Sequence, residues 1–166
     1  MFDLKPLSPS AIGAALVKAE RYRLINEPEQ SQSICEDILR ADPDNYDAQI
    51  MLILAITDGF PRSTSDAARA VDLVANLPSE YDRHYYAGLV AERHARAVLF
   101  QGGMGEGAGS HWLHQAMREY EQAEALRPQG NDDARLRWNA CARLFNTHPA
   151  LQRDNEEERS APITLE

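Results

Sequence analysis

A glycine-rich segment is the most prominent candidate for ligand chemistry in this sequence. Five glycines lie between Gln101 and Ser110, directly ahead of a predicted helix. Such a segment could hold a phosphate group with backbone N–H groups at the helix N-terminus. A nucleotide-binding loop, however, follows a β-strand and supplies a lysine, and this segment has neither. Glu106 would also repel phosphate, so the sequence favours a flexible connector.

Histidines are the second candidate, because His111 and His114 are spaced i, i+3 on a predicted helix and would share one side of it. Zinc requires three or four ligands, and only Glu106 or a residue of the preceding helix could complete the set. Surface or packing histidines are the simpler interpretation. His94 lies close to the apolar stripe of its own helix and is predicted to be a core histidine. We predict no metal site and no cofactor.

Charged side chains are dense on the two longest predicted helices. They are Glu92, Arg93 and Arg96 on the first of these helices, and Glu119, Glu121 and Glu124 on the second. Paired carboxylates catalyse acid–base steps when burial separates their pKa values. Charges at this density on helix surfaces are usually solvated i, i+4 pairs, and no nucleophile lies beside them. The sequence therefore predicts a protein that is not an enzyme.

Trp138, which is flanked by Arg135 and Arg137, has two interpretations. Tryptophan and arginine dominate the energetics of protein interfaces, so an exposed Trp138 would anchor a partner. Alternatively, Trp138 packs on the preceding helix while Asn131 caps the last one. The packing interpretation is favoured.

Composition excludes several classes of partner. The 166 residues include 17 Lys and Arg against 26 Asp and Glu, a formal net charge of −9. An acidic chain is poorly suited to bind nucleic acid or an anionic membrane surface. No signal peptide and no membrane span are expected. Cys35 and Cys141 lie in apolar helical stripes and are predicted to be buried thiols, which favours a cytoplasmic protein.

Apolar residues recur at helical spacing, and no alternating strand pattern occurs. Prolines and capping residues divide the chain into seven predicted helices, at roughly 9–26, 28–41, 46–57, 66–77, 80–100, 111–127 and 131–146. The third helix is apolar almost all round and is predicted to be a middle layer. We expect an N-terminal extension at residues 1–8, one helical domain at 9–147 and a disordered acidic tail at 148–166.

The helical pattern also has a repeat. The first copy reads Ala15-x2-Lys18-Ala19-x2-Tyr22, then Ser31-x3-Cys35, then Pro43. Later copies keep Leu52-Ile53-x2-Ile56 with Ala67-x3-Val71, and Ala116-x3-Tyr120 with Pro128. This spacing resembles the tetratricopeptide repeat, a helical hairpin that buries its apolar face by stacking on a copy. The segment LRPQGNDDARLRWNACARL is similar to the end of an uncharacterised group of bacterial tetratricopeptide proteins, which implies no activity.

The resemblance implies an all-α solenoid of three hairpins closed by a C-terminal capping helix. Pro78 and Pro128 are about 50 residues apart, roughly 16 more than the usual period of about 34. The third hairpin is therefore predicted to be elongated, by about eight residues in each helix, and to protrude from the stack.

The resemblance also implies a concave groove that is lined by the first helix of each hairpin and holds a partner. Its residues here are Leu16, Glu20, Arg23, Ile50, Leu54, Tyr85, Leu89 and Glu92. The alternative is that Ile50, Leu54 and Leu89 are core. The family's clamp for chaperone C-termini needs lysine and asparagine, and the equivalent positions here hold other residues, so no such clamp is predicted.

We therefore expect a noncatalytic adaptor that binds a protein or peptide segment in this groove, with Tyr85 as its best anchor. Glu20, Asp58 and Glu92 would favour a segment that carries basic residues beside apolar ones. The alternative is a secretion-type chaperone of similar repeat architecture that shields an apolar client segment. The sequence leaves the oligomeric state and the identity of the partner open.

Overall fold

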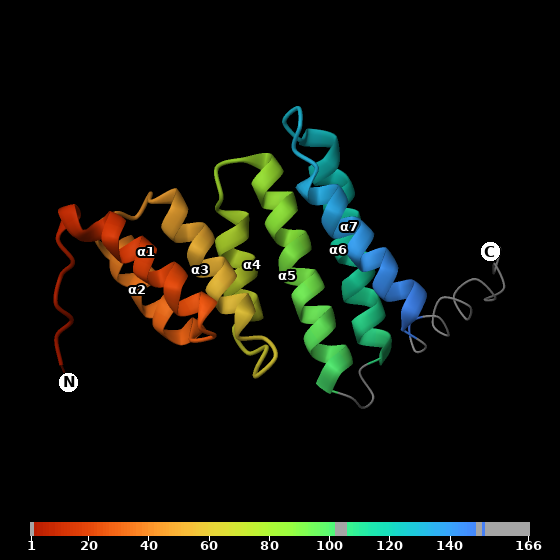
Figure 1. Cartoon of the computed structure of the whole chain (residues 1–166), viewed down its shortest axis with the longest axis horizontal. Coiled ribbons are helices and arrows are strands. Elements are labelled where there is room, and N and C mark those ends of the chain that lie inside the picture. The colour runs from red at the N-terminus through yellow and green to blue at the C-terminus, as the bar shows by residue number, and fades with distance from the viewer. Residues whose placement is uncertain (1, 102–105, 149–150, 152–166) are drawn as a thin grey trace, which may run out of the picture. The chain divides into compact units, whose positions relative to one another are not determined.

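The computed structural model describes residues 2–101, 106–148 and 151. All regular structure in these ranges is helical, which confirms the predicted all-α class. Figure 1 labels the α-helices α1 to α7 along the chain. The chain divides into two compact units, unit 1 (Met1–Pro78) and unit 2 (Ser79–Glu166), so the division falls between α4 and α5.

Unit 1 contains a short 3-10 helix (Pro9–Ala11) followed by α1 (Ile12–Leu24), α2 (Pro28–Ala41), α3 (Tyr46–Asp58) and α4 (Ala67–Ala75). Consecutive helices pack against one another, and α1 also contacts α3. The helices lie close to the predicted ranges. Helix α3 contacts α1, α2 and α4, and most of its apolar side chains are buried, which confirms the prediction of a middle layer.

Local chemistry sets the helix ends in unit 1. After α1, Asn26 takes a left-handed φ of 62°, and the Glu27 N–H donates to the Tyr22 carbonyl at 2.8 Å. This is the hydrogen-bond pattern of a Schellman C-cap, in which asparagine tolerates the left-handed region. Pro28 then occupies the first turn of α2, where its missing N–H costs nothing. The short turn Asn26–Glu27 thereby folds α2 back along α1.

Unit 2 contains α5 (Glu80–Gln101), α6 (Glu106–Leu126) and α7 (Asp133–Thr147). Helices α5 and α6 have 22 and 21 residues, against 13 and 14 in α1 and α2, so this hairpin is longer, as predicted. Helix α6 packs along α5, and α7 packs on α6 and also contacts α5. Ser79 caps α5, because its Oγ accepts the Asp82 N–H at 3.2 Å.

Helix α6 starts earlier than the predicted helix at about 111–127. The helix begins at Glu106, and Ser110 is buried within it. Gly109 lies against α5, where an added Cβ would be 2.7 Å from Cγ and Cδ2 of Leu99, so a larger residue would clash there. Most of the predicted glycine connector, residues 102–105, lies outside the described residues.

The core of unit 2 combines small side chains with a few large ones. It comprises Ala91, Ala95, Leu99, Leu113, Ala116, Tyr120, Cys141 and Leu151. Leu151, which belongs to the segment 148–166 that was expected to be a tail, is fully buried in this core. A leucine that buries its whole side chain gains about 1.5–3 kcal/mol, and this favours an ordered chain at that residue. Residues 149–150 and 152–166 lie outside the described residues.

Gly88 allows α5 and α6 to approach closely. A Cβ added there would lie 2.7 Å from Cδ1 and Cε1 of the Tyr120 ring, which is fully buried. The ring has little freedom to move away, because its hydroxyl is hydrogen-bonded to Glu92. Helix propensity favours alanine over glycine in a helix interior, so at this position packing and propensity oppose each other.

We predict that packing prevails and that Gly88→Ala destabilises the protein by about 1–3 kcal/mol, the usual cost of overpacking. Gly13→Ala is the matched control, since nothing lies within 4 Å of its added Cβ and the residue is in α1. Propensity alone should stabilise that variant by about 0.5–1 kcal/mol. Thermal melts followed by circular dichroism compare the two variants. Equal shifts for both would show that the close approach at Gly88 has no energetic weight.

Candidate functional site

A buried carboxylate lies at the centre of unit 2. The side chain of Glu92, in the middle of α5, is 1% exposed. Its Oε2 accepts a hydrogen bond from the Tyr120 hydroxyl of α6 at 2.8 Å. Its Oε1 accepts one from Arg96 Nε at 3.0 Å and lies 3.5 Å from Arg137 Nη1 of α7. One carboxylate therefore joins all three helices of the unit.

Burial and charge both act on the groups around Glu92. Burial, followed by the negative charge of Glu92, raises the pKa of Tyr120, so this phenol stays protonated and donates its hydrogen bond. Burial works to lower the pKa of Arg137, but Glu92, Tyr120 and Tyr85 outweigh it and raise this pKa. Tyr120 and Arg137 therefore both keep their protons at neutral pH.

Four tyrosine rings pack together at this site, and Tyr85 contacts the other three. Tyr85 stacks on Tyr81 with ring centroids 5.8 Å apart, and it meets Tyr86 edge-on at 5.1 Å. It also lies 6.0 Å from Tyr120, which is the only fully buried ring of the four. Tyr85 is half-buried and packs against the core of unit 2. The predicted anchor is therefore held on several sides while part of its ring stays accessible.

The predicted groove residues of unit 1 lie on α1 and α3. Glu20 is exposed, whereas Leu16, Arg23, Ile50 and Leu54 are half-buried. Arg23 Nε donates to Asp58 Oδ2 at 2.6 Å, and its Nη1 lies 3.7 Å from the Met51 sulfur. This pair brings α1 and α3 together. Neither Arg23 nor Asp58 is thus an isolated surface charge.

The three predicted groove residues of unit 2 all lie on α5 but differ in exposure. Tyr85 is half-buried, while Leu89 and Glu92 are 2% and 1% exposed. The expectation of a partner segment with basic residues rests on the charges of Glu20, Asp58 and Glu92. Arginines neutralise Asp58 and Glu92 in the structure, and only Glu20 is left exposed. The argument for a basic partner segment thereby loses two of its three charges.

Sequence reasoning missed two members of this site, Arg137 and Tyr120. In the sequence, Arg137 is notable only as a neighbour of Trp138, and Tyr120 only as the large residue of a repeat pair. One signal was available: Glu92 follows the apolar run Leu89-Val90-Ala91, with an arginine four residues later. A carboxylate in an apolar stripe requires partners of opposite charge. The second arginine comes from α7, and only the fold brings it close.

The remaining candidate residues, the histidines and Trp138, contact neighbouring side chains and backbone groups of unit 2. His114 Nδ1 lies 3.1 Å from the Ser110 carbonyl oxygen and its ring packs on Phe145, while the His94 ring packs on Trp112. Burial lowers the pKa of His94, which keeps it neutral at pH 7. Trp138 packs against the core and donates to Glu121 on α6 at 3.0 Å, which confirms the packing interpretation. Within the described ranges, no three His, Cys, Asp or Glu side chains form a possible metal site.

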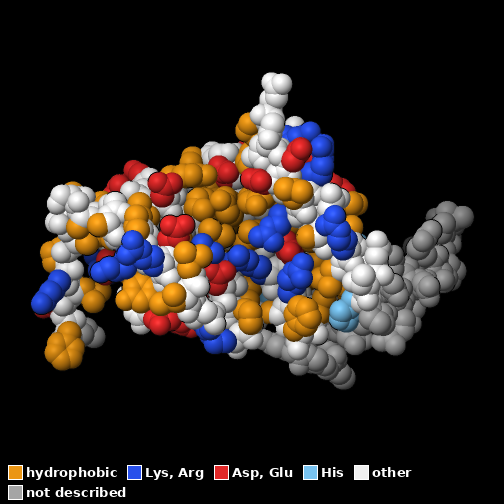
Figure 2. Space-filling model, in the orientation of Figure 1, with side chains coloured by type: hydrophobic (Ala, Val, Ile, Leu, Met, Phe, Trp, Pro, Cys, Tyr) orange, Lys and Arg blue, Asp and Glu red, His pale blue; other side chains and the backbone are white. Residues whose placement is uncertain are grey.

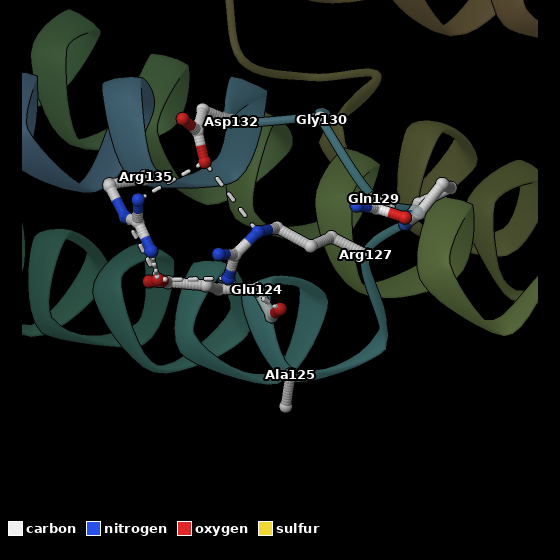
Figure 3. Close-up of a pocket in the computed structure, with 8 residues that line it drawn as sticks. Glu124, Ala125, Arg127, Gln129, Gly130, Asp132 and Arg135 are labelled. Carbon is white, nitrogen blue, oxygen red and sulfur yellow. Dashed lines mark hydrogen bonds and ion pairs between the residues drawn. The ribbon is translucent and has the colours of Figure 1, made fainter.

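A second charged site lies at the turn between α6 and α7, where an open hollow of about 480 Å³ occurs (Figure 3). Glu124 Oε1 accepts from Arg135 at 2.6 Å and from Arg127 at 3.1 Å. Asp132 Oδ1 lies 3.1 Å from Arg135 and 3.5 Å from Arg127. Two arginines thus face two carboxylates. Because these charges cancel, this turn has no preference for an ion of either sign.

Both cysteines are free and buried, as predicted. Burial raises the pKa of Cys35 to about 11 and that of Cys141 to about 12. Thiol reagents attack the thiolate, so we expect neither thiol of the native protein to react at pH 8, and both to react after denaturation. Counting thiols with a chromogenic disulfide reagent checks this. Rapid release of one equivalent from the native protein would contradict the burial of that cysteine.

The same pKa shifts predict how stability depends on pH. Well below pH 8.5 both thiols are protonated in the folded and unfolded states. Between about pH 8.5 and 11 the unfolded thiols ionise while the folded thiols largely keep their protons, so stability should fall as pH rises. Tyr81, Tyr86 and Tyr120 also have raised pKa values, and their contribution begins as the unfolded tyrosines ionise near about pH 10. Replacing both cysteines by alanine should therefore flatten the profile between about pH 8.5 and 9.5, measured by urea unfolding.

No family model, curated protein or solved structure matches the chain. None of the helices in the described part of the chain combines the length and apolar character that a membrane span requires.

Proposed function

We propose that this chain is a noncatalytic, cytoplasmic adaptor that holds a segment of a partner protein on the face formed by α5 and α7 of unit 2. This proposal rests on the surroundings and the partial exposure of Tyr85. Its ring contacts three other tyrosine rings, yet the residue is only half-buried. A rigid, partly exposed aromatic ring loses little conformational entropy on binding, which makes it an effective anchor.

The helix contacts within each unit support the resemblance to tetratricopeptide repeats. In unit 1, the first helices of consecutive hairpins, α1 and α3, touch each other, and in unit 2 α5 touches α7. Stacked hairpins make these contacts between equivalent helices. In this interpretation α7 closes the array, and the side chains that α5 and α7 share form a surface for a ligand. The two buried thiols fit a reducing compartment.

We predict that Tyr85→Ala weakens partner binding by about 2 kcal/mol or more, the range of an interface hot spot. A partner captured on the full chain is identified by mass spectrometry, purified and titrated against each variant. Tyr85→Phe keeps the ring and should retain most of the affinity. Tyr46→Ala, which removes an exposed tyrosine of α3, is the matched control.

Stability must be measured on the same preparations, because Tyr85 also packs against the core. Its truncation should lower the melting temperature, so affinity is expressed per folded molecule. If Tyr85→Ala and Tyr46→Ala bind the partner equally well per folded molecule, α5 and α7 do not form the binding face. Loss of binding by Tyr85→Ala alone supports the proposal.

A further inference from the structure

Arg96 on α5 and Arg137 on α7 form a pair of arginines around Glu92. Their interaction with Glu92 does not use all of their hydrogen-bond donors. Both side chains are 36% exposed, whereas the carboxylate between them is 1% exposed. Figure 2 shows blue Lys and Arg side chains gathered over the part of unit 2 where α5 and α7 lie. The carboxylate that orders the pair is therefore buried, while the guanidinium groups reach solvent.

Among the residues that the structure describes, the charges recorded at this point do not cancel. Glu92 carries one negative charge and faces two guanidinium groups, which leaves an excess of one positive charge. At the turn between α6 and α7, by contrast, two arginines face two carboxylates. Across the chain acidic residues outnumber basic ones by nine. An uncompensated positive charge on such a chain attracts an anionic group locally, without favouring polyanions in general.

The donors that remain can serve a ligand. Arg96 donates to Glu92 through Nε, and a guanidinium has four further N–H groups on its two terminal nitrogens. Arg137 approaches Glu92 Oε1 with Nη1 at 3.5 Å. The Glu92 carboxylate thereby limits the rotamers of both arginines before any ligand arrives. Pre-ordered guanidinium donors bind a carboxylate more strongly than free surface arginines do.

We infer that the partner segment carries an aspartate or glutamate side chain, which the arginine pair binds, next to an apolar or aromatic residue, which Tyr85 contacts. This inference rests on the proposed function and reverses the charge expected from the sequence. A single carboxylate matches the single excess charge. Nucleic acid is a poor match, because binding it requires many uncompensated basic residues. This chain is acidic overall.

The test uses the full chain and an array of short random peptides whose C-termini are amidated, so that no terminal carboxylate is present. The inference predicts that bound peptides are enriched in Asp or Glu beside aromatic or aliphatic residues. The tightest peptide is then titrated by fluorescence anisotropy against Arg96→Gln. We expect affinity to fall at least tenfold, since a hydrogen bond to a charged group contributes about 1.5–3 kcal/mol. Raising the salt concentration should also weaken binding to the wild-type chain.

Arg143→Gln is the control, because Arg143 is an exposed arginine on the same helix as Arg137 and has no contact with Glu92. It should leave the affinity within twofold of wild type. Arg96→Gln leaves Glu92 with Tyr120 and Arg137, and a thermal melt verifies that it folds. If Arg96→Gln does not fold, Arg96→Lys replaces it and should weaken binding while keeping the charge, because lysine lacks the planar donor geometry.

The outcomes separate this inference from the adaptor proposal. Peptides enriched in Lys or Arg, or binding that ignores Arg96→Gln, would overturn the inference and leave the adaptor function standing. Stronger competition by inorganic phosphate than by acetate would also overturn it, in favour of a phosphorylated ligand. If no peptide binds and Tyr85→Ala leaves capture of the partner unchanged, both proposals fail together.

Discussion

The burial of the Glu92 carboxylate is the constraint on which the structure of unit 2 depends. Removing an ionised carboxylate from water costs several kcal/mol unless hydrogen bonds and opposite charges replace its hydration. In unit 2 the replacement comes from Tyr120 on α6, Arg96 on α5 and Arg137 on α7. Each of the three helices must therefore keep its place for the charge to be tolerated, and any sliding of one helix past another would leave a buried group without a partner.

Several other features of unit 2 follow from this constraint. Tyr120 can reach Glu92 only because Gly88 leaves room for its ring, and small residues such as Ala91 and Ala95 allow the same close approach along α5. Arg137 is drawn toward Glu92 of α5. The buried charge thereby holds both arginines and the Tyr120 ring, which lies against Tyr85 of the proposed binding face. This is how a group that is itself hidden from solvent can order a surface for a partner.

Much of the fold was predictable, because it depends on local signals. The apolar period of 3.6 residues, Pro28 after the Asn26 turn and Ser79 ahead of α5 act within a few residues, and the helices begin and end close to where these signals place them. Leu151 and the Glu92 network were not predictable, since their partners are distant in sequence. A glutamate followed four residues later by an arginine looks the same on a solvated helix face as it does in a core. The tyrosine of α6 and the arginine of α7 make the difference, and only the packing of three helices reveals them.

The central claim is that Glu92 and Tyr120 are energetically coupled, and a double-mutant cycle measures this coupling directly. Tyr120→Phe and Glu92→Leu are made singly and together in the full chain and unfolded in urea. Tryptophan fluorescence follows unit 2, because both tryptophans of the sequence, Trp112 and Trp138, belong to it. We predict that Tyr120→Phe destabilises the wild-type protein by about 1.5–3 kcal/mol, the range for a hydrogen bond to a charged group, and that it is neutral or stabilising once Glu92 is leucine. The same cost for Tyr120→Phe in both backgrounds would show that the carboxylate does not hold these helices together.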